Sequence, residues 1–323
     1  MFIESRGTWT DLIAGVGLQI AEVFDQGQEE YQSGIGAVLN VTSGEGAQKN
    51  FTGKTGIGRI SAFNDGDDLP GGRRYKTYTT IVNYNNYGKS VDVTKNNMED
   101  RDFDAQLDEM KDLSVAANFS QDESGTQLFN GGFATTVLVN GYNMTYYGVG
   151  LPTFSTVHPT VVPVQSPQSN ASSTGIAFGH DNLETASVAL IQQRTDDGLA
   201  MALMGKPTIV VPPSLQREAR EETESELDPE TANNAINVYK GAMDVVTSTF
   251  MASLNGGSDT AWFVVIPGRH RLTHEVRQAP RLEKDVNIKN KVATFTVDAR
   301  WADYAKDWRR TWGSKGDLAA YSS

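Results

Sequence analysis

A polar, glycine-rich β segment in the first third of the chain constrains the fold more than any other feature. Residues 46–88 contain KNFTGKTGIGRISAF and RYKTYTTIVNYNNYG, separated by the turn signal NDGDDLPGGRR. Extended stretches on either side of a Gly/Pro/Asp turn predict a long two-stranded arm. The arm holds too few large apolar side chains to form a core of its own. We therefore expect a partner to bury it.

The triplet Gly53-Lys54-Thr55 within this arm is similar to the end of a nucleotide-binding P-loop. The P-loop pattern needs an earlier glycine at the position that Gln48 occupies, and a helix that starts at the Lys-Thr pair. Glycines and β-branched residues at 56–60 oppose such a helix. We interpret the glycines instead as part of the outgoing strand of the arm, where the backbone has to bend and approach neighbours closely.

Composition narrows the class of protein. The chain has 323 residues, with 28 Lys and Arg against 40 Asp and Glu, a net charge of −12. This length allows one large or two medium domains, and the negative charge argues against non-specific wrapping of nucleic acid. The sequence has no cysteine, so disulfides, thiolate chemistry and Cys zinc sites are excluded. No apolar run approaches the roughly 20 residues of a membrane span, so we expect no membrane contact.

Apolar periodicity predicts two long helices near the arm. Residues 8–25 carry apolar side chains at helical spacing. Residues 98–128 form the best helix, about 45 Å long at 1.5 Å per residue, with Gly131-Gly132 as its stop. Glu99 and Asp100 suit the positive end of that helix.

The remaining segments alternate between strands and helices, which predicts an α+β fold. Helices are predicted from His180 to about Arg194 and over 214–226. The strands and strand-rich pieces are predicted in GIGAVLNV, GRISAF, SVDVT, KPTIVVPP, INVYKGAMDVVTSTF (strand, turn, strand), AWFVVIP and ATFTVDARWADYA.

Ser155 and His158 are the candidates for a hydrolase. They lie in PTFSTVHP, which lacks the Gly-x-Ser-x-Gly pattern of a nucleophile elbow and has proline at both ends. We interpret both residues as parts of a rigid loop, and a Ser/His hydrolase stays a remote alternative.

Two further patterns could hold metals. His270 and His274 have the spacing of a zincin helix but lack its glutamate, and arginines surround them, so we expect solvated histidines. Asp65, Asp67 and Asp68 beside Gly66 predict an Asp/Gly turn rather than a calcium loop. The sequence therefore predicts no catalytic residue, no cofactor and no metal site.

Taken in order, these segments resemble the major capsid (head) protein family of tailed bacteriophages. ISAFNDGDDLP followed by YKTYTTIVNYNNYGKSVDVTKNNMED resembles the extended loop of the family and the junction into its spine helix. GKPTIVVPPSLQREARE, NVYKGAMDVVTSTF and TAWFVVIP resemble the axial domain, and TFTVDARWADYAKDWRRTWGSKGD resembles the closing strand and tail. LFNGG followed by GVGLPTFSTVHP is similar to the Mu-like head-subunit branch.

The resemblance implies a division of the chain. The expected parts are an N-terminal arm with a helix (1–45), an extended β-hairpin loop (46–88), a peripheral domain with the spine helix 98–128 (89–195), an axial domain (196–285), and a return strand with the C-terminal tail of the peripheral domain (286–323). We further expect the core to fold without residues 54–86.

The resemblance also implies a function. Copies would form hexamers and pentamers that close into an icosahedral head around DNA, which they would contact weakly and non-specifically. The protein would reside in the virion, be assembled in the host cytoplasm, and work with portal and decoration or cement proteins. We expect no room for a scaffold segment before the arm, so either the scaffold is a separate protein, which Met1 favours, or the sequence is already the processed form. An encapsulin-like compartment is the alternative. The expected contacts between subunits are Lys54, Arg59, Asp65, Asp67, Asp68, Arg73, Arg74, Glu99, Asp100, Arg309 and Arg310.

Overall fold

The computed structural model describes residues 9–31, 33–96, 103–135, 141–142, 144–146, 149–160, 166–201, 205–227 and 236–321. The helices are α1 (Trp9–Glu30), α3 (Phe103–Asn130), α4 (His180–Gln192) and α5 (Gln216–Glu224), with short 3-10 helices η1 (Ile35–Ala37), η2 (Pro213–Leu215), η3 (Thr249–Met251) and η4 (Ser253–Asn255). The strands are β1 (Asn40–Ser43), β2 (Gln48–Lys54), β3 (Lys76–Asn83), β4 (Asn85–Thr94), β5 (Gly141–Tyr142), β6 (Thr145–Tyr146), β7 (Val149–Gly150), β8 (Thr208–Val211), β9 (Asp244–Thr247), β10 (Trp262–Val265), β11 (Leu272–Asn287), β12 (Val292–Ala305) and β13 (Thr311–Ser314).

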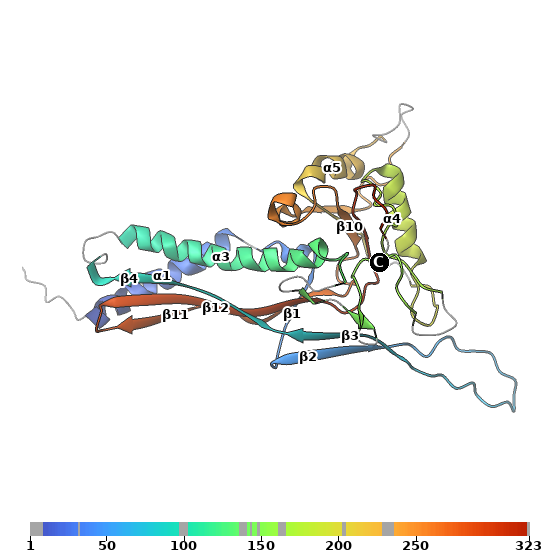
Figure 1. Cartoon of the computed structure of the whole chain (residues 1–323), viewed down its shortest axis with the longest axis horizontal. Helices are drawn as coiled ribbons and strands as arrows, with labels where there is room; N and C mark the ends of the chain where they lie inside the picture. The colour runs from blue at the N-terminus through green and yellow to red at the C-terminus, as the bar shows by residue number, and fades with distance from the viewer. Residues whose placement is uncertain are drawn as a thin grey trace, which may run out of the picture.

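Three parts are visible in Figure 1. A long plank holds α1 and α3 with β4, β11 and β12, a compact head holds α4, α5 and β10 at one end of the plank, and an extended loop leaves beyond β2 and β3. Mixed helix and sheet in this arrangement confirms the predicted α+β class. Within the described residues, no helix is long and apolar enough to cross a membrane.

The plank is a sheet covered by two helices. Its strand order is β1-β11-β12-β4, with β5 beside β12. Alternate residues of β12 are buried, as expected of a strand with one face against a core. Phe295 lies in one cluster with Ile20 of α1 and Met110 of α3. The strand predicted in ATFTVDARWADYA is thereby confirmed.

Strand β11 was not predicted. Pro280 and a run of charged residues interrupt the alternation of apolar and polar side chains that would indicate a strand. Register shifts between Val276 and Gln278 and between Gln278 and Arg281 interrupt its pairing with β12. Such irregularities let a strand accept a proline without losing the whole ladder. The 16-residue strand therefore depends on its partner rather than on its own pattern.

Helices α1 and α3 match the two predicted long helices, although α1 runs on to Glu30. The start of the predicted helix 98–128 lies outside the described residues, and α3 ends at Asn130. Gly27 allows the helices to approach, because a Cβ at this position would lie 2.9 Å from the carbonyl oxygen of Lys111. Ser114 Oγ then donates to the carbonyl oxygen of Phe24 (2.7 Å).

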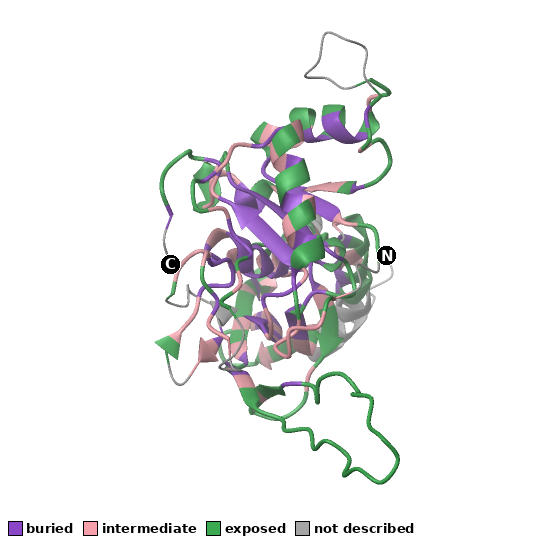
Figure 2. Cartoon of the chain, turned by 90° about the vertical axis from the view of Figure 1, so that its right-hand side faces the viewer, coloured by how far each residue is buried: buried purple, intermediate pink, exposed green. Residues whose placement is uncertain are grey.

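The head is built on the sheet β13-β10-β8-β9, in which every residue of β8, β10 and β13 is buried. Figure 2 shows this buried centre in purple beneath exposed helix surfaces. The buried strands of KPTIVVPP and AWFVVIP and the helix from His180 are confirmed. The helix predicted over 214–226 is confirmed in shorter form, with a 3-10 turn before it.

Two predicted strand pieces are only partly confirmed, and Asn40 and Val41 are the part of GIGAVLNV that lies in a strand, β1. Residues 35–37 of GIGAVLNV form η1, because Asp122 of α3 accepts hydrogen bonds from the backbone N–H groups of Gly34 (3.2 Å) and Ile35 (3.1 Å). In INVYKGAMDVVTSTF only the second strand forms, as β9, while Ile236 makes an isolated bridge with Leu227.

Candidate functional site

The extended loop, residues 55–75, is the part of the chain that departs most from a packed fold. It begins where the β2–β3 ladder ends. Thr55 N donates to the carbonyl oxygen of Tyr75 (2.9 Å), and Tyr75 N donates to Thr55 Oγ1 (3.0 Å). Beyond this pair no strand is present among residues 55–75, all of which the structure describes, so the strand predicted in GRISAF is wrong. At the tip Asp67 N donates to the carbonyl oxygen of Asn64 (3.1 Å) and Gly66 has a φ of +92°, which confirms the Asp/Gly turn.

Four apolar side chains of this loop face solvent, and the sequence reasoning missed them. The exposed fractions are 60% for Ile57, 102% for Ile60, 56% for Phe63 and 72% for Leu69. Figure 2 shows the loop as a continuous exposed trace. Full burial of such a side chain lowers the free energy by about 1.5–3 kcal/mol relative to leaving it exposed to water. The sequence predicted an arm without a core of its own, but glycines break its period-2 pattern, so the structure was needed to show which apolar side chains of the arm lie in solvent.

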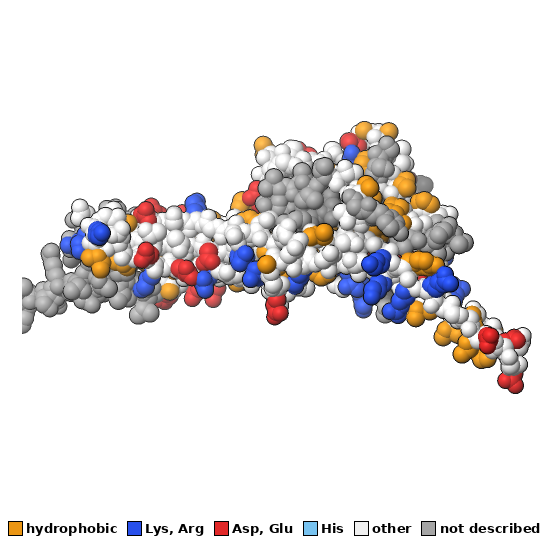
Figure 3. Space-filling model, turned by 60° about the horizontal axis from the view of Figure 1, so that its bottom comes forward, with side chains coloured by type: hydrophobic (Ala, Val, Ile, Leu, Met, Phe, Trp, Pro, Cys, Tyr) orange, Lys and Arg blue, Asp and Glu red, His pale blue; other side chains and the backbone are white. Residues whose placement is uncertain are grey.

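Charge on the extended loop is divided between tip and stem. Figure 3 shows acidic side chains at the tip, and basic ones along the underside near the base of the loop. The seven predicted contact residues of this region are all exposed: Lys54, Arg59, Asp65, Asp67, Asp68, Arg73 and Arg74. Glu99 and Asp100 lie outside the described residues.

The hairpin that carries the loop is fixed to the plank by a buried carboxylate. Glu275 of β11 accepts a hydrogen bond from Tyr84 (2.7 Å), from Tyr304 of β12 and from the ammonium group of Lys49 in β2. Burial favours the neutral acid, but these donors outweigh it and lower the pKa of Glu275. Phe51 stacks on Tyr304 with ring centroids 5.2 Å apart.

Strand β3 belongs to this anchored region rather than to the loop. Tyr78 and Val82 on β3 and Tyr84 just after it are buried. Their burial contradicts the expectation that the core folds without residues 54–86. The part of the chain that can be removed without loss of core side chains is residues 56–74.

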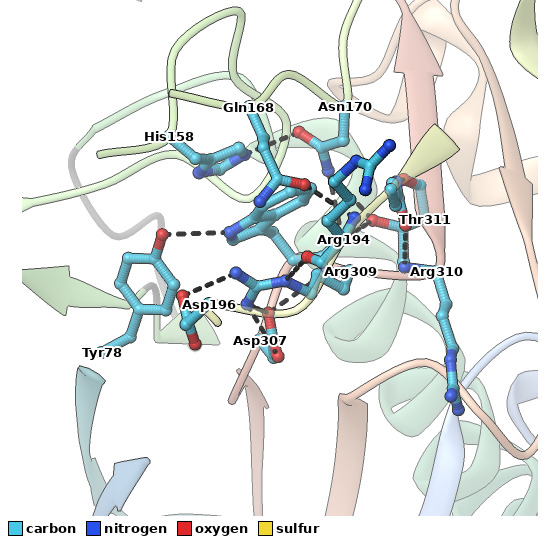
Figure 4. Close-up of polar contacts among 12 residues, drawn as sticks. Tyr78, His158, Gln168, Asn170, Arg194, Asp196, Asp307, Arg309, Arg310 and Thr311 are labelled. Carbon is cyan, nitrogen blue, oxygen red and sulfur yellow. Dashed lines mark hydrogen bonds and ion pairs between the residues drawn. The ribbon is translucent and has the colours of Figure 1, made fainter. Parts of the chain in front are cut away.

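Arg309 is part of the interior. Its side chain is 5% exposed, and its guanidinium donates to Asp196 Oδ1 (2.7 Å), Asp307 Oδ1 (3.1 Å) and the carbonyl oxygen of Arg194 (2.8 Å). Figure 4 shows these groups converging. Burial disfavours the charged form of Arg309, but the carboxylates of Asp307 and Asp196 outweigh it and raise the pKa. Arg309 thus stabilises the fold of the single chain through these buried contacts.

Arg310, the neighbouring predicted contact, is half-buried and has a positive φ of 64°. Its backbone N–H donates to Gln193 Oε1 (2.6 Å), and its guanidinium donates to the carbonyl oxygen of Arg269 (3.4 Å). Asp197, which follows Asp196, lies against the base of the extended loop. A Cβ on Gly56 would lie 2.4 Å from Asp197 Oδ2, so a larger side chain at position 56 would displace this carboxylate.

Ser155 and His158 are buried and each has a structural role. Ser155 Oγ donates to the carbonyl oxygen of Val157 (3.0 Å). His158 Nε2 lies 2.7 Å from Asn170 Oδ1, and its ring stacks on Trp308 with centroids 4.2 Å apart. Burial lowers the pKa of His158 to about 3, which makes it a weak base. The geometry supports the rigid-loop interpretation.

The two histidines at zincin spacing are not solvated, contrary to expectation. His270 is 2% exposed and His274 is fully buried. His274 lies on β11 with Nδ1 2.6 Å from Asp303 Oδ1 of β12. The i,i+4 spacing suggested a helix face, but His270 lies in the turn before β11 and only His274 lies on the strand.

Comparisons with known proteins agree with this architecture. A family model described as phage capsid protein matches residues 77–312. The chain is similar to the capsid of a native GTA particle (TM-score 0.54, 12% identity, 91% of this chain and 92% of that chain covered). It is also similar to the mature capsid of bacteriophage PhiM1 (TM-score 0.52, 10% identity, 88% and 86% covered) and to the capsid of bacteriophage JBD30 (TM-score 0.52, 14% identity, 66% and 89% covered). No curated protein matches the chain.

Proposed function

The chain belongs to the phage capsid protein family, and from this premise we propose that its copies form hexamers and pentamers that close into an icosahedral head around viral DNA. Membership identifies it as a shell protein of the virion. The tailed-phage capsid fold is shared with solved capsids over most of the chain. A position within the Mu-like branch remains a prediction.

The main observation behind this proposal is the exposure of the extended loop. Ile57, Ile60, Phe63 and Leu69 lie in water on a loop that makes no core of its own, while the stem is anchored through Glu275. An anchored stem that carries a loop with unburied apolar side chains suits a contact with another subunit, because the apolar surface is removed from water only on assembly. We propose that the loop lies on a neighbouring copy.

We propose that the plank is the peripheral domain and that the head is the axial domain. The expected bounds, 89–195 with 286–323 for the peripheral domain and 196–285 for the axial domain, do not follow these two parts, because β11 lies in the plank whereas α4 and β13 lie in the head. Residues 1–45 and 46–88 are proposed as the N-terminal arm and the extended loop. The exposed residues Lys54, Arg59, Arg73 and Arg74 are proposed as contacts with acidic groups of neighbours.

Further roles are proposed on the same basis. The protein would be assembled in the host cytoplasm, with a scaffold, a portal and decoration or cement proteins as partners, and would contact packaged DNA weakly because its net charge is −12. It would perform no catalysis, which the burial of Ser155 and His158 supports. The encapsulin-like alternative is the weaker one.

Electron microscopy and light scattering of the purified chain test the proposal. We expect rings, sheets or closed shells whose amount rises with protein concentration. A folded protein that stays monomeric at every salt and crowder concentration would contradict it. Shells that form in the cell and contain enzymes but no DNA would favour the compartment alternative.

A further inference from the structure

A groove of about 610 Å³ lies between β1 and the turn that leads from β10 into β11. Val41, His270, Arg271 and Lys306 are among its lining residues, and no Asp or Glu is among the described residues that line it. We call it the β1 groove. Its cationic character contrasts with the net charge of −12 of the whole chain.

The two cations of the β1 groove lack a local counterion. Arg271 is exposed, and Lys306 lies over the ring of Phe51 at 4.1 Å from its centroid. Within the described part of the chain, neither has a carboxylate at ion-pair distance. Burial lowers the pKa of Lys306, Glu275 raises it, and Arg271 and Lys49 lower it further. Glu275 is already held by Lys49 and two tyrosines, so the groove keeps a surplus of positive charge.

Apolar surface adjoins these cations. Val41 of β1 is 51% exposed at the edge of the groove. A suitable occupant therefore carries carboxylates beside apolar side chains. In the described residues the tip of the extended loop has this composition, with Asp65, Asp67 and Asp68 between exposed Phe63 and Leu69. Figure 1 shows the loop running away from β1, so the tip of the same chain does not reach the groove.

We propose that the β1 groove receives residues 63–69 of the extended loop of a second copy of the chain, with Arg271 and Lys306 pairing with Asp65 and Asp68. This inference rests on the proposed assembly function and assigns the receiving site for the loop. Asp67 is not part of the proposed pairing, because its Oδ2 already accepts a hydrogen bond from Asn64 Nδ2 within the tip (3.1 Å). Charge complementarity would set the register of the contact, while Phe63 and Leu69 would supply the apolar burial.

Charge exchange tests the pairing. The measurement is the critical protein concentration for assembly, followed by light scattering and sedimentation. Arg271→Glu alone, Arg271→Glu with Lys306→Glu, and Asp65→Lys with Asp68→Lys should each raise this concentration by about tenfold or more. The combination of all four substitutions exchanges both pairs of charges and should restore the concentration to within about threefold of wild type. Arg271→Lys, which keeps the charge, is the matched control and should assemble like wild type.

Several results would overturn the proposal. Assembly of Arg271→Glu at the wild-type concentration would show that the groove receives no acidic segment of another copy. The same result is expected if the groove instead binds a polyanion such as DNA, so it would also overturn the proposal. Failure of the combined variant to recover would exclude this pairing. If Arg271→Glu does not fold, Lys306→Gln carries the test with the same expected direction. Failure of the wild-type chain to assemble would instead contradict the proposed function.

Discussion

Arg309 and Asp196 form a buried ion pair, with Nη2 and Oδ1 2.7 Å apart. Arg309 precedes β13, and Asp196 lies in the turn after α4, next to the residue that touches the base of the extended loop at Gly56. The pair therefore joins the segment before β13 to the turn after α4. Burial raises the pKa of Asp196, and Arg309 lowers it again without fully offsetting the effect of burial and of the neighbouring carboxylates of Asp307 and Asp197.

Replacement of Arg309 by Met should destabilise the unassembled chain by about 3–5 kcal/mol, because two carboxylates would be left without their buried cation. Arg309→Lys should recover part of this loss, since an ammonium group cannot make all the hydrogen bonds of the guanidinium. Urea unfolding measures both. Arg310→Lys is the control and should change the midpoint little. Equal midpoints for Arg309→Met and Arg310→Lys would refute a structural role for Arg309.

Stability should fall with acid partly because of His158. Its folded pKa is about 3 against an ordinary value of 6.5, so between these values the unfolded chain binds a proton that the folded chain does not. This contribution is fully present above about pH 6.5 and is lost as pH falls towards 3. His158→Gln should flatten the pH dependence of the unfolding free energy by up to about 1.4 kcal/mol per pH unit between pH 4 and 6. The slope is the readout, since the lost stacking on Trp308 lowers stability at every pH. An unchanged slope would refute the assignment.

Replacement of residues 56–74 by a four-residue Gly/Ser linker should abolish assembly and leave the fold intact. The Thr55–Tyr75 pair and the buried side chains of β3 remain in this variant. Circular dichroism and urea unfolding check the fold, and electron microscopy checks for shells. A full-length control with Ser at Ile57, Ile60, Phe63 and Leu69 should also assemble poorly, because it removes the apolar surface but not the chain. Shells of normal size from the linker variant would show that the loop is dispensable.

Substitution of Gly125 should loosen the contact between α3 and the segment that follows α1. A Cβ at Gly125 would lie 1.8 Å from Ile35 Cδ1 and 2.7 Å from Ile35 Cγ1. Overpacking of this kind costs about 1–3 kcal/mol, against a helix-propensity gain of about 1 kcal/mol. We expect net destabilisation of Gly125→Ala in urea unfolding. Gly34→Ala, where nothing lies within 4 Å, is the control. A stabilised Gly125→Ala would show that Ile35 moves aside freely.

The sequence by itself determined the elements whose signal is local. Helical periodicity located α1 and α3, unbroken apolar runs located β8 and β10, and the Asp/Gly/Pro cluster located the tip of the extended loop. In each case the residues that specify the element lie within the element. The resemblance to capsid proteins followed from the order of these signals and is confirmed by the family match over residues 77–312.

The tertiary structure alone decided which polar groups are interior and which apolar groups are not. Arg309 and His274 are buried because their partners, Asp196 and Asp303, come from distant segments, and desolvation is offset only when such partners are in place. Strand β11 likewise forms through pairing with β12, because Pro280 and its charged residues give it no period of its own. Conversely, the sequence did not show that Ile60 and Phe63 are among the most exposed apolar residues of the arm. They lie in solvent because the loop is held away from the rest of its own chain, and that arrangement exists only after the distant segments have packed.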